Sequence, residues 1–105
     1  MSKLIFYCEY KLKKNVSAAD FLEASKKLSD DYITKQKGYV SWEQLNDGDT
    51  WADILTFETM EEVKAFEENS AANPTEFAMN FYSFINMPSC KVRYYSVERT
   101  YGDAK

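Results

Sequence analysis

A tight turn between two strand-forming runs places the strongest constraint on this chain. The tetrapeptide Asn46-Asp47-Gly48-Asp49 separates residues 39–45 from residues 50–57, and Asn, Asp and Gly tolerate the positive φ angles of a tight hairpin. The sequence therefore predicts an antiparallel β-hairpin in the middle of the chain. The tetrapeptide resembles part of a calcium loop, but the remaining ligands and the closing bidentate Glu are missing, so we expect a turn and no metal.

Helical patterns occur on both sides of this hairpin. Before it, Ser17 and Asp20 form a capping-box-like start, and apolar residues then recur at helical spacing. Gly38 can take the left-handed conformation of a helix cap, which predicts that the first helix continues to this residue. After the hairpin, Thr59 and Glu62 form a second capping box and predict a second helix.

The second helical region is interrupted at Asn73-Pro74. Asn73 as the N-cap and Pro74 at the first helical position predict a new helix start. Pro88 is expected to end this segment. The apolar stripe of the new helix consists of Phe77, Phe81, Phe84 and Ile85.

Strand patterns lie at the two ends of the chain, at residues 4–12 and 90–101. Both segments carry large side chains in both registers, which is typical of strands buried on two faces. The resulting order, β-α-β-β-α(α)-β, predicts an α+β fold of ferredoxin-like type with a four-stranded antiparallel sheet and its helices on one face. A chain of 105 residues has room for one such domain, covering residues 1–105.

The helices can cover only one face of the sheet, and we expect the other face to be apolar as well. Full burial of each large side chain stabilises the protein by about 1.5–3 kcal/mol, so we expect a partner surface to cover this face. A second copy of the chain is the simplest such partner. The sequence therefore predicts a homodimer. The alternative is a monomer whose face is partly exposed or covered by the C-terminal tail. The side chains expected on this face are Ile5, Tyr7, Trp51, Leu55, Phe57 and one of Tyr94 and Tyr95.

Composition argues against several classes of function. Seventeen acidic and thirteen basic residues give a net charge of -4, which leaves little basic surface for nucleic acid. The chain has no His, the side chain most often used as a general base, metal ligand or haem ligand. The longest uncharged stretch, residues 77–90, is short of the roughly 18 residues that suggest a membrane span. Residues 4–8 are too short for a secretory signal.

The two cysteines, Cys8 and Cys90, are too few for a disulfide framework. A single bridge is one alternative, because the first and last strands are neighbours in the predicted fold. We expect reduced thiols in a cytoplasmic protein, because two cysteines are so few. We also expect both thiols to be unreactive, since no His or clear cationic neighbour lowers the pKa of either one.

The chain resembles a known family. The similarity covers essentially the whole chain and includes no diagnostic catalytic motif. The segments that carry it are Gly38-Tyr39-Val40-Ser41-Trp42-Glu43, the hairpin, Trp51-Ala52-Asp53-Ile54-Leu55-Thr56-Phe57, Thr59-Met60-Glu61-Glu62 and Phe66. These segments are similar to the antibiotic-biosynthesis-monooxygenase-like proteins of the dimeric α+β barrel superfamily.

The resemblance implies that two chains form a dimeric α+β barrel with a pocket between sheet and helices. The superfamily includes cofactor-free oxygenases of polycyclic quinols and anthrones, haem-degrading enzymes, lactone isomerases and proteins that only bind ligands. The haem-degrading branch uses an Asn, a Trp and a haem-ligating His, whose positions fall here near Glu9, Phe66 and Glu76-Phe77. None of the three residue types is kept. Tyr or Cys can also bind haem iron, so a haem-binding or haem-degrading protein is a minority alternative.

The leading hypothesis is a cofactor-independent monooxygenase that acts on an electron-rich, quinol-like aromatic molecule without a metal or flavin. A non-catalytic ligand-binding or regulatory barrel is the alternative. Glu9, the only acidic group within the first strand, and Asp53 on the third strand are the candidate catalytic bases. Each carboxylate has a structural interpretation as well: Glu9 can pair with Lys11, and Asp53 with Arg93 or with a lysine of a neighbouring strand.

Aromatic residues are candidates for lining the pocket, where planar ligands stack and a few polar groups set their orientation. Packing in the core or at the dimer interface is the common role of such residues. The candidate ligand-binding residues are Tyr7, Trp42, Trp51, Phe66, Phe77, Phe81 and Tyr94, with Asn80 as a possible hydrogen-bond donor to a substrate oxygen.

Overall fold

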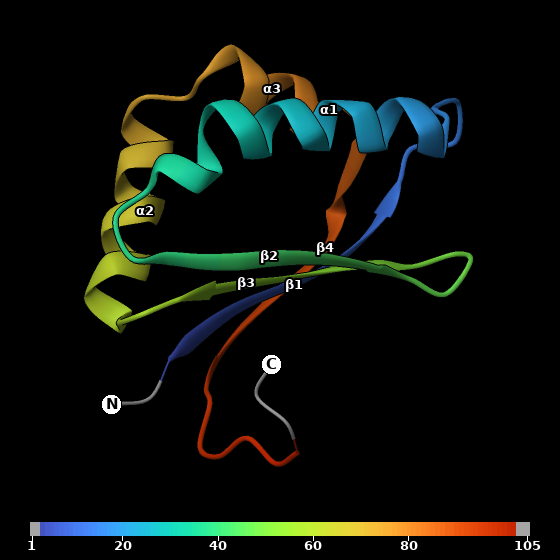
Figure 1. Ribbon diagram of the computed structural model, residues 1–105. Helices are drawn as coiled ribbons and strands as arrows, with labels where there is room; N and C mark the ends of the chain where they lie inside the picture. The colour runs from blue at the N-terminus through green and yellow to red at the C-terminus, as the bar shows by residue number, and fades with distance from the viewer. Residues whose placement is uncertain (1–2, 103–105) are drawn as a thin grey trace.

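The four strands form one antiparallel sheet in the order β2-β3-β1-β4, with α1 and α3 over one face and α2 closing the same side at one end (Figure 1). The computed structural model describes residues 3–102. This arrangement confirms the predicted ferredoxin-like α+β fold. The elements are β1 (Leu4–Leu12), α1 (Ala18–Asp31), the 3-10 turn η1 (Ile33–Lys35), β2 (Tyr39–Asn46), β3 (Trp51–Phe57), α2 (Met60–Ala72), α3 (Glu76–Tyr82) and β4 (Ile85–Ser96).

The local signals at the hairpin and at two helix starts are confirmed. Gly48 has a positive φ of 108° in the turn between β2 and β3. The Ser17 hydroxyl accepts a hydrogen bond from the Asp20 backbone N–H at 3.0 Å, and the Thr59 hydroxyl accepts one from the Glu62 N–H at 3.2 Å. Each cap satisfies a backbone donor that has no partner within its helix.

Two helix boundaries differ from the prediction. The first helix ends at Asp31, not at Gly38, because the chain turns at Tyr32 to bury Ile33, which is 5% exposed. The third helix is capped by Thr75, whose hydroxyl accepts from the Ala78 N–H at 3.0 Å. Asn73 is not its cap, since the Asn73 N–H still bonds to the carbonyl of α2 at Asn69.

The last strand begins earlier than predicted, at Ile85 instead of residue 90, and ends at Ser96 instead of residue 101. Ile85 pairs with Leu12, and the register shifts between Glu9 and Lys11. This irregularity lets the edge strand accommodate Pro88, which cannot donate to the ladder. The predicted stripe residues Phe84 and Ile85 therefore follow α3 and are not part of it.

The distribution of side chains over the two faces of β3 also differs from the prediction. The register pairs Phe6 with Leu55 and Leu4 with Phe57, and paired residues share a face. Trp51, Leu55 and Phe57 therefore lie under the helices, and the smaller Ala52, Ile54 and Thr56 lie on the other face. The outer face is less apolar than expected, because the larger side chains of β3 pack in the core.

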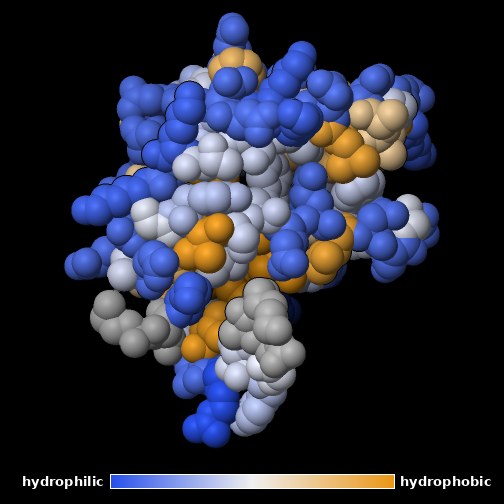
Figure 2. Space-filling model, in the orientation of Figure 1, coloured by the Kyte–Doolittle hydropathy of each residue, from blue (hydrophilic) through white to orange (hydrophobic). Residues whose placement is uncertain are grey.

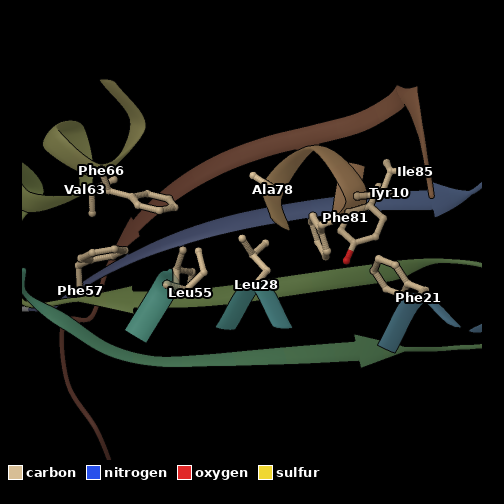
Figure 3. Close-up of a cluster of buried hydrophobic side chains, with 11 residues drawn as sticks. Tyr10, Phe21, Leu28, Leu55, Phe57, Val63, Phe66, Ala78, Phe81 and Ile85 are labelled. Carbon is tan, nitrogen blue, oxygen red and sulfur yellow. The ribbon is translucent and has the colours of Figure 1, made fainter. Parts of the chain in front are cut away.

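The core consists of aromatic and aliphatic side chains packed between the sheet and α1, α2 and α3 (Figure 3). Phe21 of α1 is fully buried, and its ring lies 5.1 Å from that of Trp51, 5.2 Å from Phe81 and 6.0 Å from both Tyr10 and Phe84, centroid to centroid. Edge-to-face and stacked pairs of this kind stabilise by about 0.5–1.5 kcal/mol each beyond their buried area. Among residues 3–102, no helix is long and apolar enough to cross a membrane.

Candidate functional site

A buried carboxyl group lies at the centre of the sheet, on the face that the helices cover. Asp53 is 9% exposed and is the register partner of Cys8 on β1. The Tyr10 hydroxyl, two residues further along β1 and therefore on the same face, donates a hydrogen bond to Asp53 Oδ1 at 2.8 Å. This hydroxyl is the partner that makes a polar group tolerable at this depth.

Burial controls the acidity of this carboxyl. Removal from water raises the pKa of Asp53 from its ordinary value of 3.8 to about 7, while hydrogen bonding from Tyr10 and Trp42 acts in the opposite direction. The same burial, with the nearby Asp53 charge, raises the pKa of Tyr10, so Tyr10 stays protonated and remains a donor. Asp53 can therefore accept or release a proton near neutral pH.

Asp53 faces a small cavity of about 40 Å³, room for about one or two water molecules. Most of its wall is apolar, so a charge in it is weakly screened. The lining comes from β1, β2, β3, η1 and all three helices and consists of Phe6, Leu28, Ile33, Trp42, Asp53, Leu55, Phe66, Phe81 and Tyr82.

An open cleft of about 280 Å³ adjoins this cavity and shares Phe6, Phe66 and Tyr82 with it. The other residues that line the cleft are Glu67, Ser70 and Ala71 of α2. Cavity and cleft together form a site that has a mostly apolar wall with one carboxyl group at its inner end and is open at its outer end.

Four of the residues predicted from the sequence meet in the cavity, namely Asp53, Trp42, Phe66 and Phe81. The others on the helix-covered side lie apart from it. Trp51 packs against Phe21, Phe77 is half-buried against the core, and Asn80 is exposed on α3. Tyr94 lies beside the cleft, stacked on Phe6 with ring centroids 5.6 Å apart.

Glu9 and Tyr7 lie on the opposite face of the sheet from Asp53, because side chains alternate along β1. The Tyr7 hydroxyl donates a hydrogen bond to Glu9 Oε1 at 3.1 Å. Both residues line a shallow depression of about 290 Å³ next to the β2–β3 turn. The structure thus separates the two carboxylates that the sequence suggested as bases.

Among the residues of the site that sequence reasoning missed are Tyr10, Phe6 and Tyr82. The signal for the first two is the alternation of β1, which places Phe6, Cys8 and Tyr10 on one face. Once the hairpin fixes β3, the same alternation brings Tyr10 next to Asp53. Tyr82 had no comparable signal, since its position depends on where α3 ends.

Cys8 and Cys90 are free, half-buried thiols. Burial raises the pKa of Cys8 to about 12 and also raises that of Cys90, so both are poor nucleophiles at neutral pH. Within residues 3–102, no three His, Cys, Asp or Glu side chains are grouped so that they could hold a metal ion.

No protein-family model and no curated protein matches the sequence. Solved structures do match it over nearly their whole length. SnoaB, a cofactor-independent oxygenase from Streptomyces nogalater, superposes with a TM-score of 0.75 at 11% identity and covers 98% of this chain and 100% of its own. A monooxygenase from the gene ActVA-Orf6 of Streptomyces coelicolor, in complex with nanaomycin D, gives 0.71 at 13% identity, with 98% and 94% covered.

A protein from Nitrosomonas europaea, described as a proposed antibiotic biosynthesis monooxygenase, gives a TM-score of 0.69 at 13% identity, with 95% of this chain and 94% of its own covered. At these identities the likeness is one of fold. It confirms, at that level, the resemblance to antibiotic-biosynthesis-monooxygenase-like proteins, and one fold of this kind can serve several chemistries.

Proposed function

We propose that this chain, which has the fold of the antibiotic-biosynthesis-monooxygenase-like oxygenases, is a cofactor-independent monooxygenase of a quinol-like aromatic molecule. The observation that carries the proposal is Asp53, a buried carboxyl with a pKa of about 7 at the inner end of an aromatic cavity. A general base is most effective when its pKa lies near the working pH. Low polarity around the carboxyl keeps water from competing with the substrate.

In this mechanism Asp53 takes the proton from a substrate hydroxyl, and the resulting anion gives an electron to O2. Recombination of the two radicals forms a C–O bond to a peroxide, which takes the proton back from Asp53. The O–O bond then breaks, and water leaves together with the hydrogen of the same ring carbon, which becomes a carbonyl. The sum is quinol plus O2 to hydroxyquinone plus water, so one oxygen atom enters the product and the substrate supplies all electrons. Tyr10 keeps the carboxylate oriented through its hydrogen bond, and Trp42 and Phe81 wall the cavity.

The size of the site limits the substrate. A cavity of about 40 Å³ cannot enclose an aromatic ring, so the ring lies in the adjoining cleft of about 280 Å³ with its hydroxyl edge toward Asp53. Cavity and cleft together are at the lower end of the roughly 300–1,000 Å³ found for small-molecule sites. We therefore propose a substrate with one or two rings.

Oxygen consumption tests this proposal. Naphthohydroquinones prepared without oxygen are mixed with the protein in air-saturated buffer, and the rate is compared with spontaneous oxidation. The expected product is the hydroxyquinone with one atom from labelled O2. Oxidation at the buffer rate, or only to the unhydroxylated quinone, would contradict the proposal. Tight ligand binding without oxidation would favour the ligand-binding barrel instead.

The pH dependence of the rate follows from the role of Asp53 as a base. The active form is the ionised one, so kcat/KM corrected for spontaneous oxidation should rise about tenfold per pH unit below pH 7. It should level off above about pH 7, where the pKa of Asp53 lies. A stopped-flow series from pH 5 to 9 measures this profile. A rate that is flat or falls over this range would exclude Asp53 as the base.

We also propose that the protein is a homodimer whose two sheets pack face to face through the side opposite the helices. Among residues 3–102 no helix covers that face (Figure 1), and apolar surface is visible at and below the level of the sheet (Figure 2). The Tyr7 and Tyr95 rings meet edge to face there, with centroids 6.2 Å apart, and Tyr95 remains 49% exposed. A patch of this kind commonly marks an interface.

Ile54→Lys tests the dimer. Ile54 pairs with Tyr7 on β1 and Glu43 on β2, so it lies in the middle of the face. Taking a charged ammonium out of water there is costly even with Glu43 beside it, because the desolvation penalty can exceed the gain from the ion pair. Light scattering after size exclusion is expected to give a dimer for the wild type and a monomer for the variant. Leu22→Lys, at a 44% exposed position on α1, is the control and should stay dimeric. A wild-type monomer would contradict the proposal.

A further inference from the structure

A phenol group of the chain itself contacts two residues that line the cleft. The Tyr94 hydroxyl donates a hydrogen bond to Glu67 Oε2, which joins β4 to α2. The Tyr94 ring is stacked on Phe6 at an interplanar angle of 27°. Since Phe6 and Glu67 both line the cleft, the ring and its hydroxyl display the two interactions that an aromatic ligand with a hydroxyl group would use there.

This contact between Tyr94 and Glu67 is at the surface, so a ligand can replace Tyr94 in it. Tyr94 is 44% exposed, so moving its ring aside costs little buried area. Of the described residues that line the cleft, Glu67 alone carries a charge. A carboxylate only accepts hydrogen bonds, and it therefore selects ligands that present a donor at this point.

We propose that Glu67 is a second binding point of the site. Its carboxylate accepts a hydrogen bond from a substrate hydroxyl group that lies far from the reacting end. The substrate class is then an aromatic with hydroxyl groups at opposite ends of a two-ring system, one directed to Asp53 and the other to Glu67. In the free protein the Tyr94 hydroxyl is hydrogen-bonded to Glu67, and the substrate hydroxyl displaces it on binding. The assignment of the reacting end rests on the proposed oxygenase function, whereas binding itself requires no turnover.

Two probes that differ in one hydroxyl group test this inference. They are 2,6-dihydroxynaphthalene and 2-naphthol, titrated without oxygen by calorimetry or by quenching of tryptophan fluorescence. A hydrogen bond to a charged group favours the dihydroxy probe, so the wild-type protein should bind it about tenfold more tightly. Glu67→Leu should bring the two dissociation constants to within about twofold. Glu68→Leu, at an exposed neighbouring position of α2, is the control and should keep the tenfold ratio.

Tyr94→Phe provides a second variant that keeps the ring and its stacking on Phe6. Without the competing phenol, the dihydroxy probe should bind a few times more tightly than to the wild type, and 2-naphthol should bind as before. Equal dissociation constants in the wild type, an unchanged ratio in Glu67→Leu, or no binding of either probe would overturn the inference.

These titrations, together with the oxygen-consumption assay, distinguish this inference from the proposed oxygenase function. If the ratio responds to Glu67→Leu as expected and no quinol is oxidised, the binding point stands and the oxygenase proposal fails. If quinols are hydroxylated and the ratio does not respond, the oxygenase proposal stands and Glu67 has no part in recognition.

Discussion

Asp53→Asn is expected to lower the rate of quinol oxidation by about 10²–10⁴-fold, the usual contribution of a general base. Asn has nearly the same shape and can still accept the hydrogen bond from Tyr10, so the cavity is kept and only the proton acceptor is lost. The expected loss is in kcat, with KM changed little, because the hydroxyl is still bound at the same place. Stopped-flow rates in air-saturated buffer measure both constants.

Glu9→Gln is the matched control for this variant. It removes a carboxylate from the adjacent strand but on the opposite face of the sheet, next to Tyr7. We expect a rate within about twofold of the wild type, since a group that does not reach the cavity cannot take the proton. The reverse result, a large loss in Glu9→Gln and a small one in Asp53→Asn, would place the chemistry on the outer face.

The same Asp53→Asn variant should alter the pH dependence of stability, in a direction set by the raised pKa. Below about pH 4 the carboxyl is protonated in both folded and unfolded chains, and its full contribution to the free energy of unfolding is present. Between about pH 4 and 7 the unfolded chain ionises and the folded one does not, so stability falls as pH rises. The rise in pKa from 3.8 to about 7 corresponds to about 4 kcal/mol in total.

Asn does not titrate, so the stability of the variant does not fall in this way as the pH rises. Relative to the wild type it should gain about 4 kcal/mol between pH 4 and pH 8 in urea unfolding. Glu61→Gln, which removes an exposed carboxylate of α2, should leave the slope nearly as it is in the wild type. Parallel stability curves for Asp53→Asn and the wild type would show that the carboxyl is not held in its protonated form by burial.

The sequence predicted the fold well because its signals are local. The hairpin at Gly48 and the caps at Ser17 and Thr59 each depend on a few adjacent residues, and the element order then leaves few topologies. The errors lie where local signals compete. Asn73, Pro74 and Thr75 all favour a helix start, and only the packing of the chain decides that Thr75 is the cap.

The candidate site was predictable only in part, for a related reason. The sequence identified Asp53 and the aromatic residues but assigned Leu55 and Phe57 to the outer face, because alternation gives two faces and does not say which one the helices cover. That choice depends on which set of side chains packs better under α1 and α2. Glu9 and Asp53 looked equivalent for the same reason, and the register that separates them is a property of the whole sheet.

Phe66→Ala is expected to destabilise the protein by about 3 kcal/mol, at the lower end of the range for large-to-small changes of buried aromatics. Phe66 is 8% exposed, and its ring lies 5.4 Å from that of Phe57 and 6.1 Å from that of Tyr32, centroid to centroid. It also lines both the cavity and the cleft, so its removal enlarges both and lets water fill the space. Water entry lowers the cost below that of a sealed void.

Urea unfolding at pH 5 measures this loss, and Phe77→Ala is the matched control. Phe77 is half-buried on α3 and lines neither space, so its truncation should cost about 1–2 kcal/mol in proportion to the smaller area it buries. The enlarged site of Phe66→Ala should also bind a three-ring quinol more tightly than the wild type does. A loss below about 1 kcal/mol would mean that Phe66 is not part of the core, and a loss without any gain for the larger ligand would mean that the cavity and the cleft do not form one site.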